Sequence, residues 1–99
     1  MKAIFLSGRL TRDPEIKEIN DKKTKVANFT VANNQSDGEN GEFFDVVCWD
    51  KTAEYAEKYL KKGQKVVVQG TFQNESYKDK DDNTRYHFRI TAHTIDFLS

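Results

Sequence analysis

The chain has 99 residues, and its 16 basic and 16 acidic side chains give a formal net charge of zero at pH 7. This length suits one domain, residues 1–99, with a single hydrophobic core. The neutral balance argues against the simplest, strongly cationic kind of nucleic-acid binder, and the single cysteine excludes an intrachain disulfide. No apolar run approaches the roughly 18 residues of a membrane-spanning helix, and the N-terminal apolar stretch is too short for a signal peptide, so we expect a cytosolic protein.

Alternation of apolar and polar residues predicts β-strands over most of the chain. The first strand lies within residues 2–10 and is broken at Pro14, because proline lacks a backbone donor and restricts the residue before it. The second strand, 25–34, and the third, within 41–51, are joined by the turn-rich segment 36–42. These two strands are therefore expected to form an antiparallel hairpin.

Residues 50–63 carry the helix signal of the sequence. Asp50 or Thr52 is placed to cap the start of this helix, and Gly63 is placed to end it. Its apolar face consists of Ala53, Ala56 and Leu60, with Tyr59 beside them.

Two further strands follow the helix, at 65–77 and 85–98, with the polar loop 78–84 between them. Gly70 predicts a bend or bulge where the sheet curls, and the apolar alternation of the last strand shifts near His93. Three strands, a helix and two more strands predict a mainly β fold. We expect a small, closed, five-stranded barrel with one α-helix between its third and fourth strands.

The third strand divides its side chains between two faces. Phe43 and Trp49 share the second face with the charged Asp45, which suits neither a dry core nor an ordinary polar surface. Two functions are open for these aromatics: stacking of nucleobases, which we favour because it needs platforms in a polar surround, and packing at a subunit interface. The other face is apolar and consists of Phe44, Val46 and Cys48.

Other prominent side chains have ordinary structural interpretations. Cys48 lies on the apolar face and is interpreted as a small hydrophobic residue, not a nucleophile. His87 and His93 lack the cysteine or carboxylate partners of a zinc site, so we predict no metal and no other cofactor. Aromatic residues in strands usually belong to the core, and we expect this of Phe29, Phe44, Phe72 and Phe88.

A resemblance to the bacterial and phage single-stranded DNA-binding proteins covers almost the whole chain. It is carried by three stretches: IFLSGRLTRDPE, VANFTVANN and FFDVVCWDKTAEYAEKYLKKGQKVVVQGTF. The resemblance implies an OB-fold, assembly into a homotetramer or at least a dimer, and binding of single-stranded DNA without reading its sequence. The family also has an acidic C-terminal tip, and because this chain stops at Ser99 we expect no recruitment of enzymes through such a tail.

The resemblance also assigns roles to individual residues. Phe43 and Trp49 match positions where the family stacks bases, and Tyr77 matches a third, although a tyrosine at a hairpin edge is also an ordinary surface residue. Lys51 and Lys62 match lysines that contact the phosphate backbone; without this match, both would be left unassigned. The outward positions Gln73, Glu75 and Ser76 are less basic than in the family.

Arg9 is assigned from its own position, on the outward side of the first strand, where it could pair with Asp45 or contact phosphate. We favour the phosphate contact.

The sequence therefore predicts sequence-independent binding and protection of single-stranded DNA in replication, recombination or repair, by a cytoplasmic, nucleoid-associated homo-oligomer. The alternative is a module resembling primosomal proteins, which acts mainly as a protein-docking adaptor at the replication fork. Near-zero net charge and the missing acidic tail favour the adaptor, whereas the aromatic pair followed by a lysine favours DNA binding. An enzyme is not expected, because no nucleophile with its base, phosphate loop or metal cluster is visible.

Overall fold

The computed structural model describes residues 3–19, 21–33 and 42–98, without the side chains of Glu75 and His87. Apart from Glu42, the connection predicted at 36–42 lies outside the described residues. The described parts contain six strands and one helix. Their bounds are β1 Ile4–Leu10, β2 Glu15–Ile19, β3 Thr24–Asn33, β4 Glu42–Trp49, α1 Asp50–Tyr59, β5 Lys65–Lys78 and β6 Thr84–Phe97.

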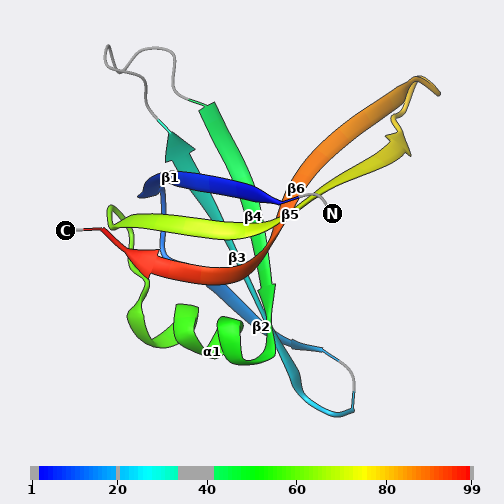
Figure 1. The fold of residues 1–99 in the computed structure, drawn as a ribbon. Coiled ribbons are helices and arrows are strands. Elements are labelled where there is room, and N and C mark those ends of the chain that lie inside the picture. Colours follow the sequence, from blue (N-terminus) through cyan, green and yellow to red (C-terminus); the bar gives the residue numbers. More distant parts are fainter. Residues whose placement is uncertain (1–2, 20, 34–41, 99) are drawn as a thin grey trace.

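Five of these strands form a closed barrel (Figure 1). Around the barrel the strands follow the order β1, β5, β6, β4 and β3, and pairing of β3 with β1 closes the ring. Neighbouring strands are antiparallel except β4 and β6, which run parallel. With α1 between β4 and β5 in the chain, this arrangement confirms the predicted mainly β barrel with one helix and is consistent with an OB-fold.

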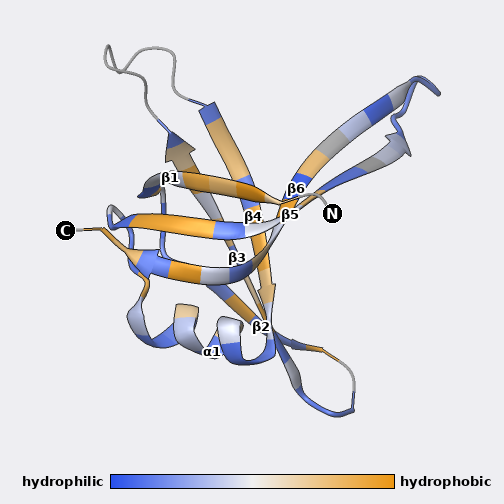
Figure 2. Cartoon of the chain, in the orientation of Figure 1, coloured by the Kyte–Doolittle hydropathy of each residue, from blue (hydrophilic) through white to orange (hydrophobic). Residues whose placement is uncertain are grey.

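A single hydrophobic core fills the barrel and extends to α1. Figure 2 shows that apolar residues gather along the barrel portions of the strands, whereas polar residues predominate on the outer side of the helix. The predicted apolar face of the helix is confirmed, since Ala53, Ala56 and Leu60 are buried in this core. In the described part of the chain, no helix is long and apolar enough to cross a membrane.

The strand β2 was not predicted from the sequence. The chain resumes an extended conformation directly after Pro14, and β2 pairs antiparallel with β3, from Glu15 opposite Asn28 to Ile19 opposite Thr24. Its sequence, EIKEI, does not alternate strictly: the two isoleucines are three positions apart and face opposite sides of the strand, and only Ile16 packs against the core. Because β2 pairs with β3 alone, it lies outside the closed ring.

The ends of α1 differ from the prediction. Trp49, the last residue of β4, is the N-cap and makes no side-chain cap hydrogen bond, so the proposed capping by Asp50 or Thr52 is wrong. The strand passes directly into the helix, and Asp50 takes a φ of 53° at this junction. The helix ends at Tyr59, before the predicted limit, and Gly63 occupies the following turn with a φ of 85°.

The strands β5 and β6 continue beyond the barrel as a two-stranded arm (Figure 1). Phe72 and Phe88 have the inward parity of the core residues but lie on this arm, where they are 37% and 52% exposed. Their rings stack on each other with centroids 5.2 Å apart. The expectation that they are core residues is therefore wrong, because the arm leaves the barrel before it reaches them. The same expectation is confirmed for the buried Phe29 and for Phe44, which packs against the core.

A bulge lies at the base of the arm, where Gln69 pairs with Thr94 but Gly70 pairs with Ala92, so that His93 is the extra residue. This single irregularity confirms both the bend predicted at Gly70 and the shift predicted near His93. A Cβ atom on Gly70 would collide with the backbone carbonyl oxygen of Thr91.

We predict that Gly70→Ala lowers the free energy of unfolding by about 1 to 3 kcal/mol, the usual effect of overpacking a well-packed site. Gln69→Ala is the matched control, since Gln69 is the exposed neighbour in the same strand and its truncation should change stability by less than about 0.5 kcal/mol. Urea unfolding of the two variants and the parent measures the difference. Equal stability of Gly70→Ala and the parent would show that the bulge does not require glycine.

Candidate nucleic-acid interface

The outward face of β4 carries the two aromatic residues that were predicted to stack bases. Phe43 is 68% exposed and Trp49 is 43% exposed. They are six positions apart along one strand, so their backbones lie about 20 Å apart at about 3.3 Å per residue. Val47, on the same face between them, is buried. The strand therefore presents two separate aromatic platforms.

Strand pairing places Arg9 in one row with Phe43. Arg9 pairs with Ala32 of β3, and Ala32 pairs with Phe43 of β4. Residues opposite each other in antiparallel strands share a face, so Arg9 and Phe43 point outward two strands apart, about 10 Å at the backbone. The Arg9 guanidinium donates a hydrogen bond from Nη1 to the carbonyl oxygen of Gly63, at 2.9 Å, which holds the cation at the barrel rim.

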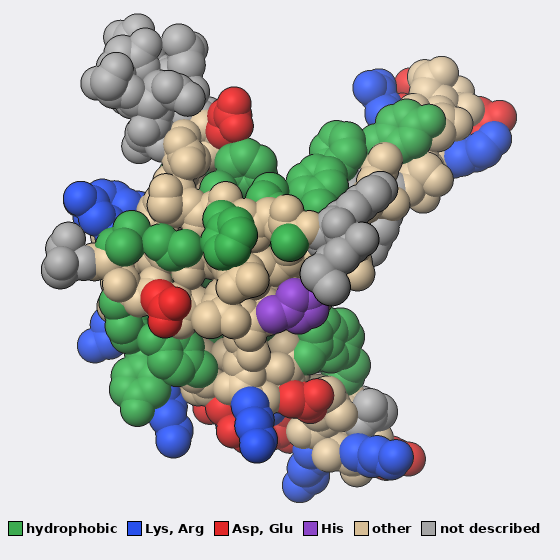
Figure 3. Space-filling model, viewed as in Figure 1, with side chains coloured by type: hydrophobic (Ala, Val, Ile, Leu, Met, Phe, Trp, Pro, Cys, Tyr) green, Lys and Arg blue, Asp and Glu red, His purple; other side chains and the backbone are tan. Residues whose placement is uncertain are grey.

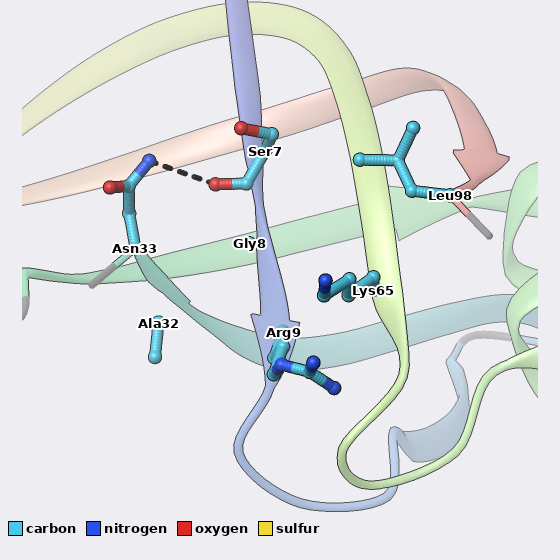
Figure 4. A pocket seen from close by; sticks show the side chains of 7 residues that line it. All are labelled: Ser7, Gly8, Arg9, Ala32, Asn33, Lys65 and Leu98. Carbon is cyan, nitrogen blue, oxygen red and sulfur yellow. Dashed lines mark hydrogen bonds between the residues drawn. The ribbon is translucent and has the colours of Figure 1, made fainter. Parts of the chain in front are cut away.

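Lys65 extends this row and was not identified from the sequence. It pairs with Arg9 across β1 and β5 and is exposed. Figure 4 shows the two cationic side chains beside a pocket of about 290 Å³. The described residues that line this pocket include two cations and no carboxylate, which suits a phosphate group. The lining consists of Ser7, Gly8, Arg9, Ala32, Asn33, Lys65 and Leu98.

Lys51 and Lys62 lie near opposite ends of α1 and do not form one cluster. Lys51 is exposed in the first turn, beside the platform of Trp49. The backbone amide of Lys62 donates to the Asp13 carboxylate at 2.8 Å, next to the residue that holds Arg9. Lys62 therefore lies close to Arg9 at the barrel rim, whereas Lys51 lies close to Trp49.

Tyr77 lies on the arm and is 54% exposed. It pairs with Arg85, four positions along β6 from Arg89, and Arg89 pairs with Asp45 of β4. Positions four apart in a strand share a face, so Tyr77 points to the same side of the sheet as Phe43 and Trp49. The pairing thus places the three predicted aromatic residues on the same side of the sheet, two on the barrel and Tyr77 on the arm.

The tip of the arm is ordered by the carboxylate of Asp79. This carboxylate accepts hydrogen bonds from the backbone amides of Asp81 and Asn83, both at 2.9 Å, and pairs with Nε of Arg85 at 2.8 Å. The bond from Arg85, followed by that from Asn83, holds the pKa of Asp79 below its usual value. Because Arg85 is also the partner of Tyr77, this tip helps to position the third aromatic residue.

A second pocket, of about 170 Å³, opens on the outward face beside Asp45. The Thr30 hydroxyl donates to the Asp45 carboxylate at 3.1 Å. Two cationic residues of this pocket, Arg12 and Arg89, were missed from the sequence, because only the pairing of β4 with β6 brings Arg89 to Asp45. The pocket is lined by Arg12, Asn28, Phe29, Thr30, Asp45, Val46 and Arg89.

Comparison with known proteins decides the family. The sequence profile described as "Single-strand binding protein family" matches residues 1–98. The chain belongs to this family.

Relatives in the genus Clostridium support the assignment. "Single-stranded DNA-binding protein 1" of Clostridium acetobutylicum is 39% identical, over 99% of this chain and 94% of its own length. "Single-stranded DNA-binding protein 2" of the same species is 37% identical, over 99% of this chain and 77% of its own length. A "Single-stranded DNA-binding protein" of Clostridium tetani is also 37% identical, over 99% of this chain and 70% of its own length.

Cys48 and His93 are the two remaining residues whose side chains could take part in chemistry, and the surroundings of both indicate a structural role. Cys48 is fully buried in the core, and burial raises the pKa of its thiol to about 12, so it is not an activated nucleophile. His93, the extra residue of the bulge, lies with its Nε2 atom 2.9 Å from the Thr71 hydroxyl. Among the residues that the structure describes, no three His, Cys, Asp or Glu side chains are grouped closely enough to hold a metal ion.

We predict that the Cys48 thiol reacts with a disulfide reagent only when the protein unfolds. The pKa of the Cys48 thiol is higher in the folded protein than in the unfolded chain. The contribution of the neutral thiol to stability is therefore complete below the unfolded pKa and is lost as pH rises toward about 12. The alkaline loss of stability should therefore be smaller in Cys48→Val, a substitution of similar size. Fast, stoichiometric labelling of the native protein at neutral pH would contradict the buried position.

Proposed function

We propose that the protein binds and protects single-stranded DNA, without requiring a defined sequence, during replication, recombination or repair in the cytoplasm. The observation that carries this proposal is the outward face of β4, where Phe43 and Trp49 are exposed and Phe43 lies in one row with Arg9 and Lys65. Family membership and the names of the relatives support it.

The proposed mechanism combines stacking with phosphate contacts. Every base has a π-face, so Phe43, Trp49 and Tyr77 can each stack a base of any kind, at about 1 to 3 kcal/mol per base. Cations at the barrel rim and beside Trp49 meet the phosphates between stacked bases. Bases in a duplex are stacked on each other and are not free to lie on these platforms. We therefore expect single strands to bind much better than duplex DNA of equal length.

The net charge of zero is compatible with this proposal because cationic residues lie together at the rim, while part of the acidic charge is paired elsewhere. The cationic residues Arg9, Lys62 and Lys65 gather at the rim, whereas the carboxylates of Asp79 and Glu57 are engaged in ion pairs with Arg85 and Lys25. All three cationic residues are exposed. A local cationic surface can thus exist on a neutral chain.

We also propose that the protein assembles through apolar surface outside the face of Phe43 and Trp49. Phe5 of β1 is 69% exposed, and the inner side of the arm carries Phe72, Phe88 and Tyr86. Figure 3 shows hydrophobic side chains along this edge of the arm. Exposed aromatic surface of this kind marks a protein contact, so a homodimer or homotetramer is expected. The same surface could serve the alternative function of a docking adaptor, which binds a different protein.

The first test of the proposed function uses the emission of Trp49, the single tryptophan. We predict strong, saturable quenching by single-stranded DNA and little by duplex. Trp49→Ala should weaken binding, measured by fluorescence polarisation, by about 1 to 3 kcal/mol with an unchanged salt slope. Lys65→Ala should instead reduce the slope by about 0.7, the contribution of one phosphate contact on a single strand.

Tyr59→Ala is the matched control for Trp49→Ala, because Tyr59 is 52% exposed but lies on α1, away from the outward face of β4. Its binding should equal that of the parent. Emission of Trp49 that is indifferent to single-stranded DNA would contradict the stacking role.

The test of assembly is light scattering at micromolar concentration, where the parent should show two or four times the mass of the chain. Phe5→Glu should lower this mass, because it places a charge in the proposed contact, whereas Trp49→Ala should leave it unchanged. A monomeric parent would refute the assembly. Dissociation by Trp49→Ala would assign the β4 aromatics to subunit contact and would remove the main support for base stacking.

A further inference from the structure

The bulge at the base of the arm places His93 near Trp49. The pairing of β4 with β6 ends with Val47 opposite Thr91, and Trp49 and His93 lie two positions further along these strands. Positions two apart share a face, and neighbouring strands are about 4.8 Å apart. Ala92 is buried and His93 is exposed, so His93 keeps the outward orientation of Thr91. The imidazole therefore lies on the same side of the sheet as the Trp49 ring.

A pocket of about 220 Å³ joins His93 to the first turns of α1. Lys51, which lies beside Trp49, contributes a cation to the lining, and Tyr55 and Ile95 contribute apolar surface. The described residues of the lining include no carboxylate. A DNA backbone combines an anionic phosphate with a sugar that can rest on apolar atoms, so it fits this lining. The lining consists of Lys51, Thr52, Tyr55, His93, Thr94 and Ile95.

The hydrogen bond within the bulge is compatible with both charge states of His93. Nε2 lies 2.9 Å from the Thr71 hydroxyl, which can donate to a neutral imidazole or accept from an imidazolium. This bond gives His93 its structural role and uses Nε2, so the other ring nitrogen, Nδ1, can donate to a different group. A protonated ring can thus keep its bond to Thr71 and donate a charge-assisted hydrogen bond to a phosphate oxygen.

The ionisable groups that line the pocket with His93 are Lys51 and Tyr55, both of α1, whereas β5 contributes the uncharged Thr71. Burial, followed by the charge of Asp96, raises the pKa of Tyr55, so its phenol stays neutral near pH 7. An imidazolium and the Lys51 ammonium repel each other, and a phosphate held by both removes this repulsion. Binding of a phosphate and protonation of His93 therefore favour each other.

We propose that His93 contacts a phosphate together with Lys51 beside Trp49, so that the protein binds single-stranded DNA more tightly when the imidazole is protonated. The inference rests on the proposed binding of single-stranded DNA and adds to it one contact and a dependence on pH. Histidine is the side chain that ordinarily changes its charge between about pH 5 and pH 8. The effect is modest, because ion pairs between exposed groups contribute little.

The test measures binding of a short oligo(dT) to the parent and His93→Gln at about pH 8 and about pH 5.5. Thymine gains no proton in this range, and glutamine stays neutral while it can still bond to Thr71. Fluorescence polarisation with a dye insensitive to pH gives the affinities. The parent should bind about threefold more tightly at the lower pH, with a salt slope steeper by about 0.7, the contribution of one phosphate contact. His93→Gln should lose both changes.

Two further variants separate the role of His93 from a general effect of acid. His93→Lys supplies a cation at both pH values, so it should bind at the higher pH as tightly as the parent does at the lower one. His87→Gln changes the other histidine of the chain, which lies in the arm, and should respond to pH like the parent. Thermal unfolding checks that each variant is folded.

An equal response to pH in the parent and His93→Gln would show that the phosphate contact of His93 is wrong, while single-strand binding stands. Loss of the response in His87→Gln alone would overturn the contact in the same way. If the parent fails to bind oligo(dT) at either pH, the proposed function itself fails, and the inference fails with it.

Discussion

Two backbone pairs between β1 and β3, Arg9 with Ala32 and Leu10 with Val31, close the sheet into a barrel. The close approach depends on Gly8, where a Cβ atom would collide with the carbonyl oxygen of Ala32 and the side chain of Val31. Closure buries the core side of the five barrel strands within the ring and aligns Arg9 with the outward side of β4. The cationic rim and the aromatic platforms are therefore consequences of the same strand contact.

The outward face of β4 shows how one short strand can carry two kinds of interaction. Its alternate residues turn Val46 and Cys48 into the core and leave Phe43 and Trp49 exposed. Stacking on the exposed rings is indifferent to base identity. The same strand can therefore support the core and offer platforms that accept any base.

Local patterns predicted much of this structure, and long-range pairing decided the rest. Alternation in β4 gave the correct faces because it depends only on neighbouring residues. The register of β4 with β6 extends only from Asp45–Arg89 to Val47–Thr91, so beyond Arg89 the last hairpin leaves the barrel. No alternation reveals that limit, and Phe88 was therefore misplaced in the core. The position of Lys65 beside Arg9 likewise depends on the pairing of two distant strands.

The central claim is that single-stranded DNA lies on the outward face of β4. Fluorine NMR of the protein labelled with fluorophenylalanine tests it most directly, because each of the seven phenylalanines gives its own signal. Saturation with a short single strand should shift the signal of exposed Phe43 and leave that of buried Phe29 unchanged. Signals of Phe72 and Phe88, on the inner side of the arm, should also stay in place. A response from Phe72 and Phe88 with none from Phe43 would contradict the account.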